Sequence, residues 1–287
     1  MFGRVLTLSV FLGLFAHATI HCVVSIPPLK TFVEAIGDGA VRSSVMVPPG
    51  HSPHSYEPKP SQMRELERAD CYFAIGLEFE KAWLPRFRAQ NPRLKIVDLS
   101  EGIRKFPMQH ADVAQEAPRP HEAEHLDPHI WTAPDNVRIM ARKIYETLAA
   151  LDPAQRPLFE KHYREFLKKI DATDREIKAL LAPLPPHSAF MVFHPSWGYF
   201  AREYGLEQLP VEVEGKAPKP RQLMALIDEA KRRKVRAIFV QPEFSDKSAK
   251  LLAAELGIPV IKVSPLAPDW SANLLRLAKA IAKGAGR

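Results

Sequence analysis

The sequence predicts an α/β protein of two lobes, each with a mostly parallel sheet flanked by helices, joined by one long rigid helix. Three observations predict this fold: a length of 287 residues, β-rich runs that alternate with helical patterns in two sets, and a long amphipathic segment between the sets. Such a length suits two domains of about 100–150 residues each. Apolar residues make up 46% and charged residues 25% of the chain, which excludes a disordered chain, a collagen-like fibre and a multi-span membrane protein.

Residues 1–18 predict a secretory signal peptide. Met1–Arg4 carries a positive charge, Val5–Phe15 is uncharged, and Ala16-His17-Ala18 has the small–x–small pattern of a cleavage site. The apolar run is too short to cross a bilayer core of about 30 Å. We therefore expect cleavage after Ala18 and a periplasmic mature protein. A lipid anchor on Cys22 is not expected, because the residues before it lack the small side chain that precedes a lipidated cysteine.

The first lobe is expected over residues 19–150. Strand-like runs alternate there with helical patterns, which is typical of βαβ units and a parallel sheet. Gly37 is expected to end the first helix. The expected strands are Cys22–Ile26, Val41–Val47, Cys71–Ile75 and Lys95–Leu99, and the expected helices are Leu29–Ile36, Pro60–Ala69 and Phe79–Ala89.

Residues 151–183 are expected to form the linking helix, with its regular part over Pro153–Leu181. This segment has no glycine or serine, and its prolines lie only in the first turn, so it differs from a flexible linker. At 1.5 Å per residue, it would be about 40 Å long. We expect a stiff rod that permits small rocking of the lobes. Its apolar face consists of Phe159, Tyr163, Phe166, Ile170, Ile177 and Leu180.

The second lobe is expected over residues 184–287, where the same alternation returns. Gly257 is placed as a helix terminator, and Ser245 is at the position of an N-cap. The expected strands are Ala189–Phe193, Gln208–Val213, Val235–Val240 and Val260–Val263, and the expected helices are Trp197–Tyr204, Pro220–Lys234, Ser245–Leu256 and Ala272–Ala282.

Three of the eleven histidines fall just past expected strand ends, where open α/β sheets bind ligands. His54 lies in the proline-flanked loop Gly50–Pro58, His129 in Asp127-Pro128-His129-Ile130-Trp131, and His194 after an apolar strand. Only folding can bring them together. Imidazole nitrogen suits zinc, copper, nickel or iron, whereas carboxylate-rich sites suit manganese, calcium or magnesium. We therefore predict a metal site of His54, His129 and His194 between the lobes, with zinc as the first choice.

A second metal-related feature is the loop 109–127. It has no helical or strand period, and it contains His110, His121 and His125 together with several acidic residues. Such a loop is either an ordinary solvated acidic segment or a low-affinity metal collector, since histidine-rich tracts bind metals.

Six sequence blocks occur in a specific order and spacing: Val23–Leu29, Gly50–Pro58, Asp127–Trp131, Phe193–Phe200, Gln241–Phe244 and Ser264–Leu266. Together they resemble the zinc-specific substrate-binding proteins of metal ABC importers, the ZnuA-like class of helical-backbone metal receptors. The resemblance covers nearly all of the mature chain. It implies that His54, His129 and His194 bind the transported zinc ion between the lobes. It also implies capture of zinc for a membrane permease, without catalysis.

One departure from the family concerns Ser264, which stands where these proteins usually have an aspartate. A serine hydroxyl is a poor zinc ligand because it stays protonated near neutral pH. The fourth ligand is therefore open between water and the carboxylates of Asp269, Glu243 and Glu57. Loss of an anionic ligand is expected to lower the affinity or to speed release.

Other functions were weighed against this one. A manganese or iron receptor of the same family would use the same site, and a surface adhesin would not need it. A zinc hydrolase with an open three-histidine site is a further alternative. No His-Glu-x-x-His or Gly-x-Ser-x-Gly motif supports it.

The remaining features of the sequence are less specific. The basic run Lys231–Lys234 suits a helix C-terminus better than nucleic-acid binding, so no nucleic-acid partner is expected, and we expect a monomer. Cys22 and Cys71 each open an expected strand. Neighbouring strands would bring them close, and the sequence leaves a disulfide and two buried thiols as alternatives.

Overall fold

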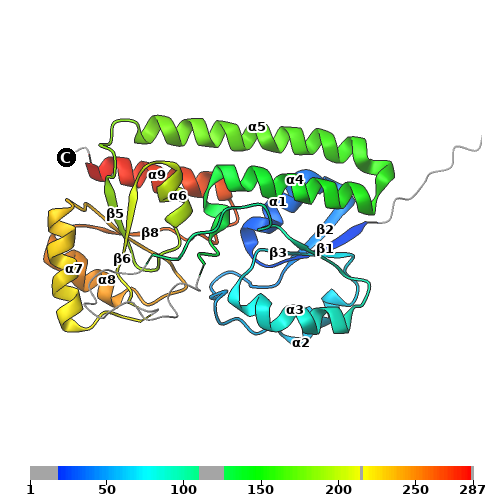
Figure 1. Ribbon diagram of the computed structural model, residues 1–287, viewed down its shortest axis with the longest axis horizontal. Helices are drawn as coiled ribbons and strands as arrows, with labels where there is room; N and C mark the ends of the chain where they lie inside the picture. The colour runs from blue at the N-terminus through cyan, green and yellow to red at the C-terminus, as the bar shows by residue number, and fades with distance from the viewer. Residues whose placement is uncertain (1–18, 110–125, 214–215, 286–287) are drawn as a thin grey trace, which may run out of the picture.

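The structure is a computed structural model that describes residues 19–109, 126–213 and 216–285. It contains two four-stranded sheets, with strand orders β2-β1-β3-β4 and β6-β5-β7-β8. All their strand pairs are parallel. Figure 1 shows the sheets side by side below a shared layer of helices. The predicted α/β fold with two parallel sheets flanked by helices is confirmed.

The first sheet is covered on both faces. Helices α1 and α4 lie on the face toward the shared layer, and α2 and α3 lie on the opposite face (Figure 1). The strands are β1 (Ile20–Val24), β2 (Val41–Val45), β3 (Cys71–Ala74) and β4 (Lys95–Asp98), and the helices are α1 (Pro27–Gly37), α2 (Pro60–Leu66), α3 (Glu78–Gln90) and α4 (Pro134–Leu151).

The second sheet repeats this arrangement. Helix α9 covers one face, and α7 and α8 cover the other (Figure 1). The strands are β5 (Ala189–Val192), β6 (Glu207–Pro210), β7 (Ile238–Val240) and β8 (Val260–Lys262), and the helices are α6 (Gly198–Glu203), α7 (Pro220–Arg232), α8 (Lys247–Leu256) and α9 (Trp270–Ala285).

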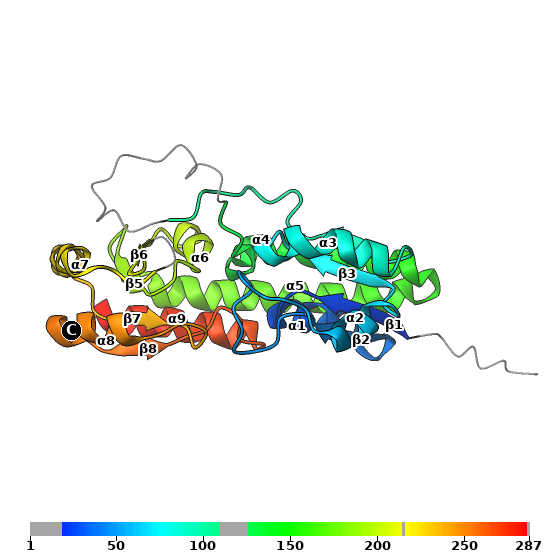
Figure 2. The same ribbon diagram turned by 90° about the horizontal axis from the view of Figure 1, so that it is seen from below.

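The long helix α5 (Arg156–Leu181) has 26 residues and follows a 3-10 turn at Pro153–Gln155. It packs against α1 and α4 in the first half of the molecule, which contains the first sheet, and against α9 in the second half, which contains the second sheet. Figure 2 shows α5 running along both halves. Its expected apolar face is buried at Phe159, Phe166, Ile170 and Ile177, and partly buried at Tyr163 and Leu180. One continuous core beneath this layer includes side chains from both sheets. Helix α5 therefore packs against both halves, and this shared packing limits their relative movement.

Helix α4 was not among the predicted elements, although its pattern is regular. Pro134 occupies its first turn, which suits a residue with no backbone N–H. Its buried side chains recur at helical spacing and pack under α5: Val137, Met140, Ala141, Ile144 and Leu148.

One of the predicted helix ends was wrong and two were confirmed. The α8 N-cap is Asp246 rather than Ser245. Helix α1 ends at Gly37, as predicted, and the positive φ of 44° belongs to the next residue, Asp38. Gly37 is needed for space instead, since a Cβ there would lie 2.2 Å from Cγ2 of Val41. Gly257 caps α8 with φ 65°, as predicted.

Strand boundaries also moved, most of all in the second sheet. Strand β7 begins at Ile238 rather than at Val235, and β6 ends at Pro210 rather than at Val213. The predicted signal peptide, residues 1–18, lies outside the described residues. Within the described part of the chain, no helix has both the length and the apolar character that crossing a membrane requires.

Candidate metal centre

His54 lies in the loop between β2 and α2 and is partly buried. Its backbone N–H donates to Oγ of Ser52 at 3.3 Å. Its Nδ1 lies 2.9 Å from Oε2 of Glu78, the first residue of α3. Burial alone would raise the pKa of Glu78, but the hydrogen bond and charge of His54 outweigh burial and lower the pKa to about 2. This carboxylate therefore stays ionised and orients the His54 ring.

His129 is buried at the start of the 3-10 turn Ile130–Thr132. Its Nδ1 and its backbone N–H both bond Oδ1 of Asp127, at 2.7 and 2.9 Å. The backbone of Asp127 is itself held, because the carbonyl accepts a hydrogen bond of 2.9 Å from the Tyr199 hydroxyl. The expectation that His129 follows a strand was wrong: it follows an isolated antiparallel bridge between Pro107 and Leu126.

His194 lies two residues beyond β5, as predicted, and is buried. The Gln241 side chain bonds its backbone N–H at 3.3 Å and its carbonyl at 2.8 Å. The Phe244 ring stacks on the imidazole, with the ring centroids 4.6 Å apart. Nδ1 lies 2.7 Å from Oε1 of the buried Glu212. Burial lowers the pKa of His194 to about 4, so this imidazole is neutral at pH 7.

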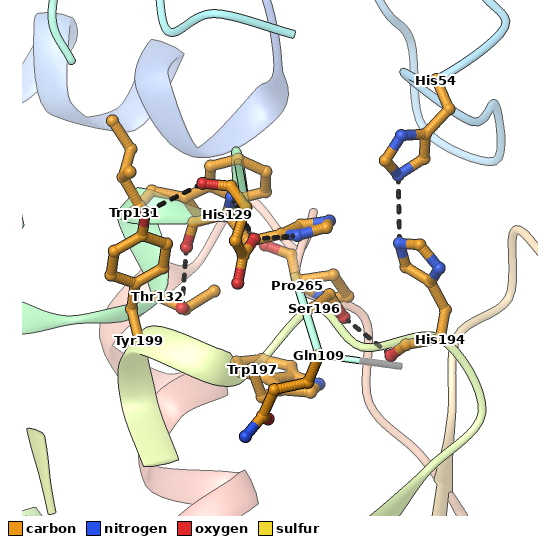
Figure 3. Close-up of polar contacts among 12 residues, drawn as sticks. His54, Gln109, His129, Trp131, Thr132, His194, Ser196, Trp197, Tyr199 and Pro265 are labelled. Atoms are coloured by element: carbon orange, nitrogen blue, oxygen red, sulfur yellow. Dashed lines mark hydrogen bonds and ion pairs between the residues drawn. The ribbon is translucent and has the colours of Figure 1, made fainter. Parts of the chain in front are cut away.

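The fold brings these three histidines together. One ring nitrogen from each lies within 4.8 Å of the others, and no other acidic, cysteine or histidine side chain among the described residues joins the group. Figure 3 shows the rings of His54 and His194 facing each other, with their Nε2 atoms 3.0 Å apart. Zinc–nitrogen bonds of about 2.0–2.1 Å place two tetrahedral ligands about 3.3 Å apart, so small ring movements would complete such a site.

The carboxylates determine which nitrogen faces the centre. An ionised carboxylate only accepts hydrogen bonds, so Nδ1 of each ring carries the proton and Nε2 of the neutral ring has the free lone pair. The Nε2 atoms of His54 and His194 face each other at 3.0 Å. The three carboxylates also supply negative charge beside the centre. The arrangement is suited to a divalent cation that prefers nitrogen ligands.

The structure brings the three predicted histidines together, and two of their carboxylate partners were not predicted. These partners are Glu78 and Glu212. Glu78 follows β3 of the first sheet, and Glu212 follows β6 of the second sheet. Glu78 lies just past the expected strand Cys71–Ile75, and this position could have pointed to it. Glu212 lies inside the expected strand Gln208–Val213, so no such signal was present for it. Asp127 was recognised only as part of a motif.

The fourth-ligand candidates stay outside the histidine group. Glu57 and Asp269 are exposed, and Oδ1 of Asp269 accepts from the Ala272 N–H at the start of α9. The Ser264 hydroxyl donates to Glu243 at 2.8 Å. Residues 110–125, with most of the histidine-containing loop, lie outside the described residues.

Comparison with known proteins places this geometry in context. The family described as "Zinc-uptake complex component A periplasmic" matches residues 22–284. A crystal structure of ZnuA superposes with a TM-score of 0.85 at 42% identity, covering 92% of this chain and 98% of that one. A zinc-bound ZnuA deletion mutant superposes with a TM-score of 0.84 at 41% identity, covering 94% and 99%.

More distant relatives are named for different metals. The high-affinity zinc uptake protein ZnuA of Bacillus subtilis is 26% identical over 83% of this chain and 76% of its own. The manganese ABC transporter substrate-binding lipoprotein PsaA of Streptococcus anginosus is also 26% identical, over 75% and 70%. These relatives share the role of a metal-binding component and leave the choice of metal open.

Proposed function

The chain belongs to the family of periplasmic zinc-uptake components, the substrate-binding proteins of metal ABC transporters, and from this membership we propose that it captures zinc and delivers it to a membrane permease. Proteins of this family bind and hand over a solute and are not enzymes, which excludes the hydrolase alternative. The observation that carries the zinc proposal is the set of three imidazoles whose Nδ1 atoms are each bonded to a carboxylate.

Zinc is favoured over manganese by the donor atoms. The group consists of three imidazoles and contains no carboxylate ligand among the described residues. Nitrogen donors bind zinc more tightly than manganese, which prefers carboxylate and water oxygens. Zinc also accepts a four-coordinate site. The alternative is a manganese receptor, as the PsaA relative illustrates by its name.

We propose water as the fourth ligand in the resting site. Ser264 uses its hydroxyl to donate to Glu243 and to accept from the Leu266 N–H at 3.1 Å, so it is already engaged. The Glu243 carboxylate is likewise engaged, because it accepts the hydrogen bond of the Ser264 hydroxyl. A site of three neutral ligands and water should release its ion more readily than a site with an anionic fourth ligand.

We also propose that the mature protein is a periplasmic monomer without a lipid anchor. Cys22, the one candidate for lipid attachment, lies in the middle strand β1 with only 2% of its surface exposed. A lipid could reach that sulfur only if β1 left the sheet.

The test is a competition titration of the metal-free protein with zinc and manganese, together with single His54→Ala, His129→Ala and His194→Ala variants. We expect one tight zinc site per chain, zinc bound more tightly than manganese, and a loss of about a hundredfold or more in zinc affinity in each variant. His187→Ala is the matched control, because His187 is 75% exposed and pairs with a surface glutamate. Tighter binding of manganese, or unchanged zinc affinity in the three variants, would contradict the proposal.

A further inference from the structure

Two cysteines face each other in the core of the first sheet, away from the histidine loops. Cys22 lies in β1 and Cys71 begins β3, and these two strands are the central pair of the sheet. They are direct partners across the parallel ladder, and their sulfur atoms are 2.9 Å apart. Both are free thiols in the structure, with 2% and 0% of their surfaces exposed.

Their placement is compatible with a covalent bond. Neighbouring strands lie about 4.7–4.9 Å apart, which is inside the Cα separation of about 4.4–6.8 Å found in disulfides. The register is fixed next to the pair as well, since the His21 N–H donates to Oδ2 of Asp70 and the Asp70 N–H donates to the His21 carbonyl, each at 2.8 Å. The sheet therefore holds the two sulfurs opposite each other without help from a bond.

We propose that Cys22 and Cys71 are a redox pair that forms a disulfide as the protein folds outside the cytoplasm. Nothing in this inference depends on which metal is transported. It uses only the extracytoplasmic location of the family and the geometry of the first sheet.

The reaction is a thiol–disulfide exchange with a disulfide oxidant, either a small molecule or a protein. One thiolate attacks a sulfur of the oxidant, forms a mixed disulfide and releases the first oxidant thiol. The second cysteine then attacks the mixed disulfide, which forms the Cys22–Cys71 bond and releases the second oxidant thiol. Two protein thiols are oxidised, one oxidant disulfide is reduced to two thiols, and the two protons end on those thiols.

The folded environment determines when this exchange can happen. The hydrogen bond to Cys71, together with burial, raises the pKa of Cys22 well above its usual value. A protonated, buried thiol is a poor nucleophile, so oxidation has to occur before the sheet closes. Once formed, the bond is equally shielded from reductants.

The bond would stabilise a strand that lies near the start of the mature chain. Strand β1 begins at Ile20, two residues beyond the predicted cleavage site, yet it lies in the centre of the sheet. Terminal strands fray easily, and a bond to β3 would close a loop of 49 residues that includes β2 and α2. The gain in unfolding free energy comes mainly from the unfolded chain, because the bond reduces its conformational entropy.

Metal binding by the two thiols is a weaker explanation of the pair. Two sulfurs provide half of a tetrahedral zinc site, and no group of three or more metal-binding side chains among the described residues includes either cysteine.

The test starts from exported full-length protein purified without reductant. The protein is unfolded in a denaturant that contains an alkylating agent, either directly or after reduction of its disulfides. The intact mass of each sample is then measured. We expect no alkylated cysteine before reduction and two after it. Two alkylated cysteines without reduction, even after refolding in a glutathione redox mixture, would overturn the proposal.

A thermal melt gives an independent readout. We expect wild-type protein that has been unfolded and refolded in a reductant to melt about 10 °C below the oxidised protein. The Cys22→Ala/Cys71→Ala double variant is the control, and its melting temperature should not respond to reductant. Equal responses of the two proteins would contradict a stabilising disulfide. Zinc stoichiometry should be the same in both, because the histidine loops lie beyond the opposite ends of the strands.

Discussion

The Nδ1 atom of each candidate ligand histidine is hydrogen-bonded to a carboxylate. The three carboxylates come from three different parts of the fold. Glu78 begins α3, Asp127 is two residues before its own histidine, and Glu212 follows β6. The carboxylates select one tautomer in each ring and hold the ring plane, so the Nε2 atoms are presented before an ion arrives. Glu212 is buried, and its Oε2 has no hydrogen-bond partner among the described residues, so His194 is the one side chain that this carboxylate bonds there.

This arrangement predicts the effect of Glu212→Gln. The amide has the same size but no charge, and its NH2 group can turn toward Nδ1 and favour the wrong tautomer of His194. We expect zinc affinity to fall about 10–100-fold, as for other outer partners of metal ligands. A competition titration with a chromophoric chelator measures the change.

Glu207→Gln is the matched control for that substitution. Glu207 is partly exposed and pairs with His187 in the same way that Glu212 pairs with His194, but outside the histidine group. Zinc affinity should be unchanged in the control. An unchanged affinity in Glu212→Gln as well would mean that the carboxylate does not position His194.

At the level of elements, α6 of the second half caps α4 of the first. The Glu203 carboxylate, in the last turn of α6, accepts from the Asp135 backbone N–H at 3.3 Å through each oxygen. Such acceptance satisfies one of the free N–H groups in the first turn of α4. Burial, reinforced by the negative charge of Asp135, raises the pKa of Glu203 from 4.5 to about 7.

The raised pKa makes this contact sensitive to pH. The folded protein holds the Glu203 proton more tightly than the unfolded chain, so the stabilisation is fully present below pH 4.5 and is lost as the pH rises toward 7. Glu203→Gln keeps an uncharged group at every pH. We expect its unfolding free energy to equal that of wild type near pH 4.5 and to exceed it by about 1–3 kcal/mol at pH 7.5.

Urea unfolding of the metal-free proteins at both pH values measures this difference. Glu255→Gln removes a carboxylate from an exposed position and serves as the control. Parallel pH profiles for wild type and Glu203→Gln would show that the Glu203 carboxyl is not perturbed in the folded protein.

At the scale of the whole molecule, the segment of His129 is bonded to the second half. The Trp131 indole N–H donates to the Pro265 carbonyl at 2.8 Å, and the Trp270 indole N–H donates to the Trp131 carbonyl at 2.7 Å. Figure 3 shows Trp131, Pro265 and Tyr199 gathered around His129. His129 and His194 are thus tied to one body, and His54 enters from a separate loop. We infer that the His54 loop makes most of the adjustment when an ion binds.

This inference predicts that Trp131→Phe weakens both the fold and the metal site. The fully buried indole would be lost, and the Pro265 carbonyl would lack its partner. We expect a loss of about 2–4 kcal/mol in unfolding free energy and a lower zinc affinity. Urea unfolding and competition titration measure the two effects.

Trp83→Phe is the control, since Trp83 is partly buried on α3 and lies beneath Arg86, away from the second half. Both quantities should change little there. If Trp131→Phe lowers stability while zinc affinity stays at the wild-type value, the indole bond does not position His129.

Local patterns were enough to predict a large part of this molecule. The alternation of strands and helices, the buried face of α5 and the glycine cap of α8 depend on residues within a few turns of each other. The spacing of buried residues in α4 is a local pattern of the same kind, although α4 was not among the predicted helices. The three histidines stood out because proline-rich loops beside expected strands carried them.

The contacts that make the site depend on distant residues, and no local pattern predicts them. His54 and His194 are 140 residues apart and meet only because the two halves pack under one helical layer. The same holds for the hydrogen bond from Trp131 to the Pro265 carbonyl. Short-range periodicity reports which face of an element is buried. Which side chains meet across that buried face is determined by packing and strand register.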